Sequence, residues 1–462
     1  MPISLNNSTI CALATGGGMS AIAVIRVSGK DAIELVDSVF KSKSGKKLKD
    51  QDGYTIHFGI IHYKGTLIDE VLISLFRNPK SYTGEDTLEI SCHGSTFIQQ
   101  SILSTLYEAG VQAAKPGEFT LRAFLNGKLD LSQAEAVADL IASENKSTHE
   151  LALKQLRGGY SEKIKQLRNS LMNFAALIEL ELDFSTEDVE FADRTQLKVL
   201  VDHICLVIQN LLSSFSLGNA IKTGIPVTIA GKPNSGKSTL LNTLLQEDRA
   251  IVSEIAGTTR DTIEDEIVLK GYSFRFIDTA GLRATTDTIE HLGIERSYAK
   301  IKEADIVLYL FDARNDSPEE VRSQIKAIAD IISEDKLLIP LGNKTDEISE
   351  EFWIEKYAGI NSAIPISAKT GKGINLIEEA LINHVQSLRQ SDTLVTNARH
   401  AEALRKADIS LKTVLQGLDH HIPGDLLSSD IRNALDSLSE ITGEVTSDEV
   451  LGVIFGKFCI GK

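Results

Sequence analysis

The sequence predicts an α/β and α protein: a mixed α/β N-terminal domain, then a helical domain that is interrupted by a second α/β domain. Strand and helix patterns alternate over residues 1–126, and apolar stripes at helical spacing run on both sides of residues 223–384. A glycine-rich stretch inside 223–384 lies between a strand pattern and a helix pattern. We therefore expect residues 127–222 and 385–462 to form one helical domain. The ends of a compact domain often lie close together, which permits such an insertion.

Length and composition are those of an ordinary globular protein. The 462 residues are enough for several domains. The net charge of −16 argues against non-specific nucleic-acid binding, because neutralising phosphates requires clustered Lys and Arg. No apolar run approaches the roughly 20 residues of a membrane span, and no signal-peptide pattern precedes the first domain. Four cysteines without metal or disulfide spacing fit a reducing compartment, so we expect a cytoplasmic protein away from membranes.

Residues 1–126 show short β-branched runs that alternate with amphipathic stretches. Strands are expected over 9–14, 21–27, 54–62, 70–76 and 86–92, and helices over 31–40 and 97–107. Gly16–Gly18 lacks the G-x-G-x-x-G spacing of a dinucleotide loop and has no helix pattern directly after it. It is therefore expected to form a plain turn.

The two helical halves carry long apolar stripes, which we expect to pack against each other as core. In the first half the stripes comprise Ala134, Val137, Leu140 and Ile141, then Ile164, Leu167, Leu171, Phe174, Leu177, Ile178 and Leu182, then Leu197, Val201, Ile204, Ile208, Leu211 and Phe215. In the second half they comprise Ala401, Leu404, Ile409, Leu411, Val414 and Leu418, then Leu426, Ile431, Leu435 and Leu438.

The stretch Gly231–Ser238 fits G-x-x-x-x-G-K-[ST], the phosphate-binding loop. It follows the strand pattern 225–230 and precedes leucines at helical spacing, so a mere glycine-rich turn is the weaker interpretation. Backbone N–H groups and a helix N-terminus would face the phosphates, Lys237 would reach the β- and γ-phosphates, and Ser238 would bind Mg²⁺. The predicted contacts are Asn234, Ser235, Gly236, Lys237, Ser238 and Thr239.

Three further motifs each follow a predicted strand. In Asp278–Gly281, the carboxylate can hold Mg²⁺ through water and the glycine N–H can face a γ-phosphate. In Asn343–Asp346, the Asp346 carboxylate can accept two N–H groups from guanine, which adenine lacks. Ser367–Lys369 can support the base through a main-chain N–H. The predicted contacts are Asp278, Gly281, Asn343, Lys344, Asp346, Ser367, Ala368 and Lys369. Residues 223–384 thus resemble a Ras-like P-loop GTPase domain.

Over essentially its full length the chain resembles the MnmE (TrmE) family of tRNA-modification GTPases. The stretches that carry the resemblance are Ser81–Asp86, Lys115–Thr120, Arg122–Leu131, Ala256–Asp261, Asp278–Arg283 and the ending Phe455–Lys462. The alternative from the residues alone is a regulatory GTPase switch in ribosome assembly. Against it, no RNA-binding module is visible and the chain is acidic.

The resemblance implies a specific reaction. Together with an FAD-containing partner, MnmG (GidA), the family adds an aminomethyl or carboxymethylaminomethyl group to C5 of the wobble uridine in tRNA. A tetrahydrofolate, in the 5-formyl or 5,10-methylene form, supplies the one-carbon unit. The resemblance also implies that the N-terminal domain binds this folate and forms a homodimer, that the partner completes a heterotetramer or larger complex, and that tRNA is met mainly through this complex. The matching folate residues are Arg26, Glu89, Lys128 and Lys462.

Cys459 lies four residues from the end and superficially resembles a prenylation box, although Gly461 and Lys462 fit that box poorly. A buried structural thiol is the other plain interpretation. The resemblance instead places Cys459 beside the folate, as a candidate catalytic thiol.

Hydrolysis needs parts that the Ras-like pattern does not supply here. Leu282 occupies the position where a Gln would orient water, and no motif places an arginine. The Asn234 amide oxygen can bind a monovalent cation, so we expect K⁺ to stabilise the developing charge. The resemblance implies that Glu290, twelve residues after Asp278, orients the water; without it, Glu290 would be interpreted as a solvated carboxylate.

The segment Ala250–Thr259 supplies the remaining predicted ligands. Ser253, Ile255 and Thr258 would join Asn234 around K⁺, and Thr259 would join Ser238 around Mg²⁺. Ser253, Thr258 and Thr259 are also expected to contact GTP.

Overall fold

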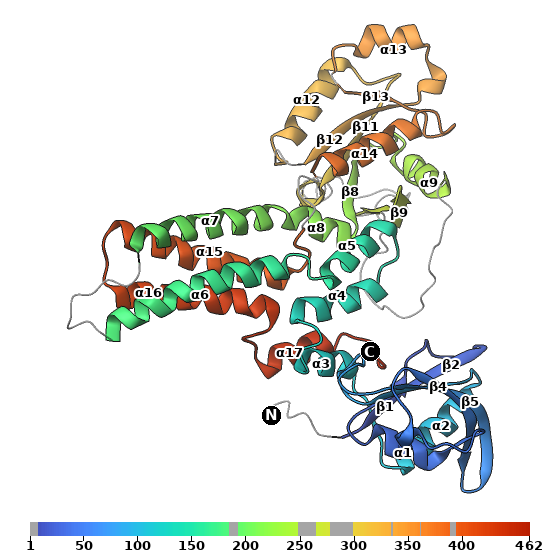
Figure 1. Ribbon diagram of the computed structural model, residues 1–462. Coiled ribbons are helices and arrows are strands. Elements are labelled where there is room, and N and C mark those ends of the chain that lie inside the picture. Colours follow the sequence, from blue (N-terminus) through green and yellow to red (C-terminus); the bar gives the residue numbers. More distant parts are fainter. Residues whose placement is uncertain are drawn as a thin grey trace. The chain divides into compact units, whose positions relative to one another are not determined.

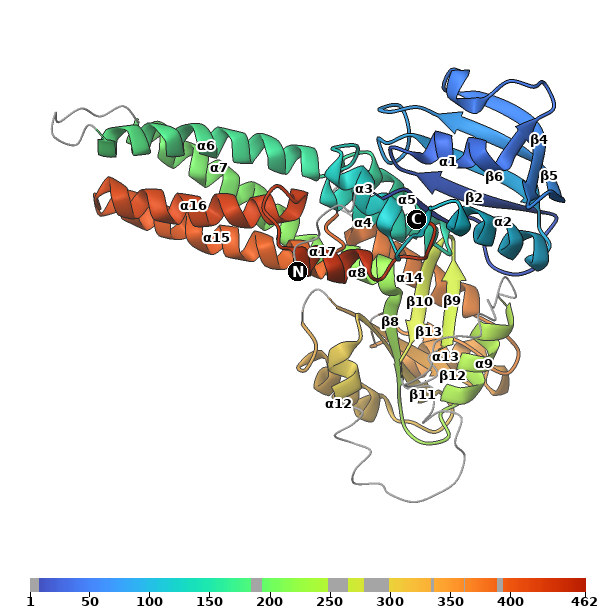
Figure 2. The same ribbon diagram turned by 90° about the horizontal axis from the view of Figure 1, so that it is seen from below.

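The computed structural model describes residues 8–183, 193–247, 265–277, 299–333, 336–360, 362–388 and 394–462. The chain divides into two compact units. Unit 1 comprises Met1–Ala142, Ala152–Cys205 and Ala403–Lys462, and unit 2 comprises Ser143–Leu151 and Leu206–Glu402. The expected fold class is confirmed: unit 1 holds an α/β part and a helical part, and unit 2 is a second α/β structure (Figures 1 and 2). The boundaries at 126, 222 and 384 stay a prediction.

The N-terminal part of unit 1 is a seven-stranded sheet in the order β3-β4-β5-β6-β2-β1-β7. Its strands are β1 (Ile10–Leu13), β2 (Ile22–Ser28), β3 (Phe40–Ser42), β4 (Thr55–Tyr63), β5 (Thr66–Phe76), β6 (Thr87–His93) and β7 (Gln112–Ala113). All neighbouring pairs are antiparallel except β1 and β7. The five predicted strands are present; β3 and β7 were missed because they are too short to show an alternation. Gly16–Gly18 lies in the connection between β1 and β2, as expected of a turn.

The two faces of this sheet differ in their burial. Ile25, Ile73 and Ile90 point to one face and pack in a core with α1 (Ala32–Val39) and α2 (Thr96–Glu108). Successive residues of a strand point to opposite faces. The other face, which we call the outer face, therefore carries Arg26 and Glu89, and it exposes the directly opposed pair Phe58 and Leu72.

The helical part of unit 1 comes from both ends of the chain. Its helices are α3 (Glu118–Leu125), α4 (Leu131–Ile141), the end of α5 (Lys146–Leu156), α6 (Ser161–Asp183), the start of α7 (Arg194–Ser213), most of α15 (Ala398–Asp419), α16 (Gly424–Thr442) and α17 (Asp448–Phe455). Helices α6 and α16 pack along each other although about 250 residues separate them, and both views show them side by side (Figures 1 and 2). Arg168 on α6 donates to Ser439 on α16, at 2.6 Å from Nε to Oγ.

Most of the expected stripe residues are buried, but four of those described are exposed: Ile141 and Leu177, at 49% and 37%, and Ile409 and Leu426. Ile409 and Leu426 are 66% and 54% exposed. On α15 the buried positions run Leu404, Asp408 and Leu411, and Ile409 lies outside this row. On α16 Leu427 is buried in place of Leu426. The buried face of a helix recurs every three to four residues, so an apolar residue one position out of phase faces solvent.

Within the described residues, one stretch, Arg194–Thr223, is long and apolar enough to cross a membrane by length and composition. Half of the most apolar 18-residue segment of this stretch is buried inside the protein. Core helices of soluble proteins can be equally long and apolar.

Unit 2 is built on a six-stranded sheet in the order β13-β12-β11-β8-β10-β9. Its strands are β8 (Ile225–Ala230), β9 (Asp265–Leu269), β10 (Tyr272–Phe276), β11 (Ile306–Asp312), β12 (Leu337–Asn343) and β13 (Ile364–Pro365). Its helices are α8 (Phe215–Thr223), α9 (Lys237–Glu247), α12 (Pro318–Ala329), α13 (Glu350–Tyr357) and α14 (Ile374–Leu388). The pairs are parallel except β9 with β10.

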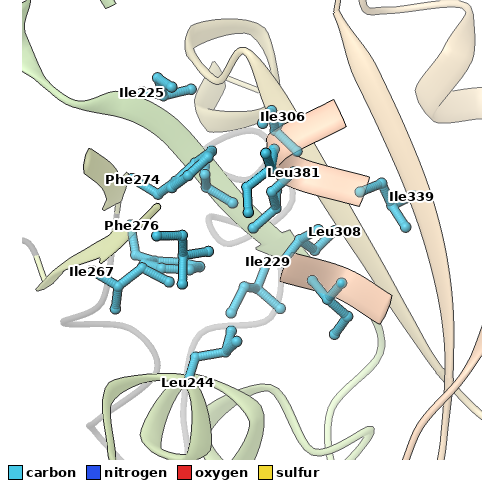
Figure 3. Packing of buried hydrophobic residues seen from close by; sticks show 14 of the residues in the cluster. Ile225, Ile229, Leu244, Ile267, Phe274, Phe276, Ile306, Leu308, Ile339 and Leu381 are labelled. Atoms are coloured by element: carbon cyan, nitrogen blue, oxygen red, sulfur yellow. The ribbon is translucent and has the colours of Figure 1, made fainter. Parts of the chain in front are cut away.

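The central strand β11 is buried on both faces. Ile306, Leu308 and Leu310 pack in one cluster with residues of α9 and α14, part of which Figure 3 shows. The alternate residues of β11 pack in a second cluster with residues of α12 and α13. A parallel sheet covered by helices on both faces reads as a continuous apolar run, as this strand does. Loops at the carboxyl ends of such strands are the usual place for a ligand.

Candidate functional site

The stretch Gly231–Ser238 connects β8 to α9, as its pattern predicts. Two of its glycines cannot be replaced without strain. Gly231 and Gly236 have φ angles of 148° and 102°. A Cβ atom on Gly231 would lie 2.1 Å from the Leu310 carbonyl oxygen, and one on Gly236 would lie 2.2 Å from Asn343 Nδ2. The glycines therefore let the loop pack closely on the neighbouring strands while its backbone curls.

Two polar side chains of the loop are suited to a phosphate group. Ser235 is 2% exposed, and its hydroxyl has no hydrogen-bond partner within the described part of the chain. Lys237 donates from Nζ to the carbonyl oxygens of Gly231 and Lys232, each at 2.8 Å. Burial disfavours the charged form of Lys237 and lowers its pKa. An anion beside Lys237 would stabilise the ammonium and offset this effect. A buried donor without a partner and a desolvated ammonium fit a polyphosphate ligand.

The loops after β12 and β13 meet the phosphate loop through one amide. Asn343 donates from Nδ2 to the Ser235 carbonyl oxygen at 2.8 Å and accepts from the Ala368 N–H at 2.9 Å. The structure thus brings together three of the motifs singled out in the sequence. Asp346 is exposed, in the short 3₁₀ turn Thr345–Glu347, so its carboxylate is accessible to a ligand.

The remaining predicted residues of this site divide into two groups. Asn234 and Thr239 are exposed, Ser238 lies half-buried in the first turn of α9, Ser367 is buried, and Lys369 is exposed. Ser253, Ile255, Thr258, Thr259, Asp278, Gly281 and Glu290 lie outside the described residues.

A second cluster lies in unit 1, on the outer face of the N-terminal sheet. Arg26 and Glu89 are directly opposed on β2 and β6, and Arg26 donates to Glu89 Oε1 from Nη2 at 2.8 Å and from Nε at 3.1 Å. The guanidinium of Arg26 also lies against the rings of Tyr82 and Phe119, at 5.3 and 5.7 Å from their centroids. The Arg26 side chain is 14% exposed and the Glu89 side chain 30%, so the carboxylate is the more accessible partner.

Lys128 and the C-terminal segment contact other parts of the same domain. Lys128 donates from Nζ to the Pro79 carbonyl oxygen at 3.1 Å, in the loop that also carries Tyr82. A Cβ atom on Gly461 would lie 2.2 Å from the Leu13 carbonyl oxygen, so the C-terminus packs directly on β1. The Gly117 N–H donates to the Cys459 carbonyl oxygen at 3.5 Å.

The four cysteines differ in accessibility. Cys459 is exposed, whereas Cys11, Cys92 and Cys205 are buried. The interpretation of Cys459 as a buried structural thiol is therefore wrong. Lys462 is partly exposed.

The sequence patterns did not single out a buried arginine. Arg122, which is 1% exposed, donates to Glu118 Oε1 at 2.8 Å and to both carboxylate oxygens of Glu85 at 3.2 Å. It also donates to the Ser8 carbonyl oxygen at 2.9 Å. No pattern of neighbouring residues marked it, because arginine is usually exposed and is fully buried only when it is paired.

Within the described residues, no group of three or more His, Cys, Asp or Glu side chains is placed to hold a metal ion. A Mg²⁺ ion needs no such group where a nucleotide is present, because it is commonly held by one or two protein ligands, waters and the substrate phosphates.

Comparison with known proteins covers the whole chain. A model of the MnmE helical domain matches residues 131–459, and a model of the GTP-binding protein TrmE N-terminus matches residues 9–128. Proteins named tRNA modification GTPase MnmE are 52% identical in Christiangramia forsetii, over 99% of both chains, and 51% identical in Cytophaga hutchinsonii, over 100% of this chain and 99% of that one. This chain belongs to the MnmE family of tRNA modification GTPases. It is accordingly a GTPase that binds GTP.

Membership of the MnmE family disfavours the alternative of a ribosome-assembly switch, because the relatives match from end to end under a tRNA-modification name. Solved structures match part of this chain only loosely. The G domain of FeoB from Methanococcus jannaschii is 21% identical with a TM-score of 0.24, over 35% of this chain and 98% of that chain. The FeoB G domain from T. maritima is 25% identical with the same TM-score, and covers 36% of this chain. Scores this low add nothing to the assignment.

Proposed function

We propose that this GTPase works with an FAD-containing partner of the MnmG (GidA) type to add a (carboxymethyl)aminomethyl group to C5 of the wobble uridine in tRNA, using a tetrahydrofolate one-carbon unit. The observation that carries the proposal is the pairing of Arg26 with Glu89 on the outer face of the N-terminal sheet, together with the packing of the C-terminal segment on strand β1 of the same sheet. These are the elements that the family resemblance assigns to a folate, and they share a chain with a phosphate loop.

GTP would be bound by the phosphate loop and by the loops after β12 and β13. The partnerless Ser235 hydroxyl, the desolvated Lys237 and the exposed Asp346 support this assignment. Ser238 and Thr259 would hold Mg²⁺, which supplies charge neutralisation at the phosphates when it is bound. Asn234, with Ser253, Ile255 and Thr258, would hold K⁺. Glu290 would orient the attacking water.

The folate would lie on the outer face beside Glu89. A carboxylate can accept two N–H groups from a pterin ring, as Asp346 would from guanine. Arg26 lies against two aromatic rings and donates from Nε and Nη2 to Glu89, so its role would be to hold that carboxylate in place. Lys128 is exposed and Lys462 is partly exposed, and these two cations would pair with the carboxylates of the folate tail. Cys459, the exposed thiol, would lie close to the one-carbon unit.

The outer face also supports a homodimer. The opposed side chains Phe58 and Leu72 are 45% and 47% exposed, and Ile56 beside them is 68% exposed. Two copies meeting through this face would bury these side chains. The acidic chain would reach tRNA mainly through the larger complex with its partner, in the cytoplasm.

Binding of 5-formyltetrahydrofolate to the full-length protein tests the folate assignment. We expect Glu89→Gln to weaken binding by about tenfold, because a hydrogen-bonded charge is worth roughly 1.5–3 kcal/mol. Glu108→Gln, which removes an exposed carboxylate from the same domain, is the matched control and should bind normally. Equal binding by both variants would remove Glu89 from the site. Wobble uridines that stay fully modified in a deletion strain would refute the reaction itself.

A further inference from the structure

The strand β11 ends in a short acidic turn, Asp312–Asp316, that no motif singled out. The Asp312 side chain is 13% exposed and accepts hydrogen bonds from five donor atoms. One donor is the Lys344 ammonium, at 2.7 Å from Nζ to Oδ2. The others are three nitrogens of Arg314 and the Asn315 amide. Burial by itself would raise the pKa of Asp312, but the hydrogen bonds from Arg314 and Lys344 hold it well below its ordinary value. Asp312 is therefore a carboxylate at any physiological pH.

Lys344 joins this carboxylate to the phosphate loop. The same ammonium donates to the Asn234 carbonyl oxygen at 2.9 Å. Lys344 and Asn234 both have left-handed backbones, with φ angles of 69° and 60°. Residues other than glycine adopt this conformation at a cost of about 1 kcal/mol or more, and they keep it only where the surroundings hold them. The contacts of the Lys344 side chain thus hold two strained loops against each other.

A second carboxylate of the turn, that of Asp316, also contacts the phosphate loop, through Lys232. Asp316 is 8% exposed, and it accepts from Lys232 Nζ on Oδ1 at 2.9 Å and from the Asp312 N–H on Oδ2 at 2.8 Å. Its carbonyl oxygen accepts from the Tyr357 hydroxyl on α13 at 2.7 Å. The turn is therefore fixed to the domain behind it and contacts lysines from both nucleotide loops in front of it.

We propose that Asp312 is a positioning residue for GTP: its carboxylate holds Lys344 against the phosphate loop, so that the base loop and the phosphate loop form one preorganised surface. Asp312 itself need not touch the nucleotide. The inference rests on the proposed GTP site, because Lys344 and Asn234 belong to it. It predicts that loss of the Asp312 charge weakens nucleotide binding without disabling hydrolysis.

The test measures GDP and GTP affinity and steady-state hydrolysis in the full-length protein. Asp312→Asn should raise the dissociation constants and the KM for GTP by about tenfold, because a charged hydrogen bond is lost, while kcat at saturating GTP changes less than about twofold. Glu303→Gln, which removes an exposed carboxylate of the same domain, is the matched control and should leave all of these unchanged. Wild-type affinity for Asp312→Asn would overturn the proposal.

A double-mutant cycle shows whether Asp312 acts through Lys344. If it does, Asp312→Asn has little further effect in a Lys344→Met background, since coupled residues are non-additive. If the two substitutions instead reduce GTP affinity independently, so that their fold-losses multiply, Asp312 has a general structural role and the proposal is overturned. Asp312→Glu keeps the negative charge and serves as the test if Asp312→Asn does not fold. A loss of GTP affinity greater than about threefold in Asp312→Glu would count against the proposal.

A different result would show that the proposed GTP site is itself wrong. In that case Asp346→Asn would bind GTP normally, whatever Asp312→Asn does. If Asp346→Asn loses GTP while Asp312→Asn keeps it, the GTP site stands and only the role of Asp312 falls.

Discussion

The Asp346 carboxylate lies exposed in the turn after β12, three residues beyond the buried Asn343 amide that ties this turn to the phosphate loop. An amide in its place cannot accept two N–H groups from guanine, but it can pair with xanthine. We expect Asp346→Asn to weaken GTP binding by at least about tenfold and to favour xanthosine triphosphate. Competition between the two nucleotides measures this. Asp330→Asn, another exposed aspartate of unit 2, is the control, and unchanged GTP affinity in Asp346→Asn would exclude Asp346 from the base site.

The cysteines allow a second prediction at the residue scale. Burial raises the pKa of Cys11 to about 12 and, as the largest cause, those of Cys92 and Cys205 to about 11. The thiolate is the reactive form, so these three thiols should be inert in the folded protein at pH 8. Iodoacetamide should label the exposed Cys459 alone, and Cys459→Ser should abolish fast labelling. Rapid modification of any other cysteine would contradict the burial seen here.

The raised thiol pKa values also set a pH dependence of stability. An unfolded cysteine loses its proton near its ordinary pKa of 9.0, whereas the folded thiols keep theirs until about 11 to 12. Stability from these groups is therefore complete below about pH 9 and decreases as the pH rises above it. Denaturant midpoints at pH 8 and pH 10 should differ in this direction.

At the scale of elements, Arg122 joins α3 to the loop between β5 and β6 and to the start of the chain. Replacing it by Met would leave the carboxylates of Glu85 and Glu118 without their buried partner. Breaking such a buried pair costs about 3–5 kcal/mol, so Arg122→Met should lower the denaturant midpoint of the N-terminal domain clearly. Arg432→Met removes an exposed arginine paired with Glu179 and should have no measurable effect. Equal midpoints for both variants would show that Arg122 is not structurally required.

At the scale of the whole molecule, the outer face of the N-terminal sheet predicts a homodimer. Phe58→Glu would place a charge among Ile56, Leu72 and the facing copy, so we expect light scattering to detect monomers. Ile354→Glu, at a residue of α13 that is 57% exposed, is the matched control and should stay dimeric. A monomeric wild-type protein, or a Phe58→Glu variant that stays dimeric, would place assembly elsewhere.

Hydrolysis is expected to depend on two GTPase domains that meet across this dimer. If K⁺ stabilises the transition state, turnover should be much faster in K⁺ than in Na⁺. Glu290→Ala should lower kcat by about 100-fold with nearly unchanged GTP affinity, the pattern of general-base or water-positioning loss. Equal rates in the two salts would dispose of the cation, and normal kcat in Glu290→Ala would dispose of the carboxylate.

The sequence by itself determined the local features of this protein. The phosphate loop and the strand 225–230 are short-range patterns, because glycine spacing and runs of apolar residues depend only on neighbours along the chain. The family followed from the same kind of evidence, namely contiguous stretches such as Arg122–Leu131 and the C-terminal Phe455–Lys462.

Only the tertiary structure decided which distant residues meet. Arg26 and Glu89 are 63 positions apart, and a cross-strand register of β2 and β6 pairs them. In the sequence Asp312 is one acidic residue at the end of a strand, and only the fold shows that Lys344 Nζ lies 2.7 Å from its Oδ2. Burial makes a charge seek a partner, but the identity of that partner depends on strand order and loop packing, which a pattern of neighbours does not contain.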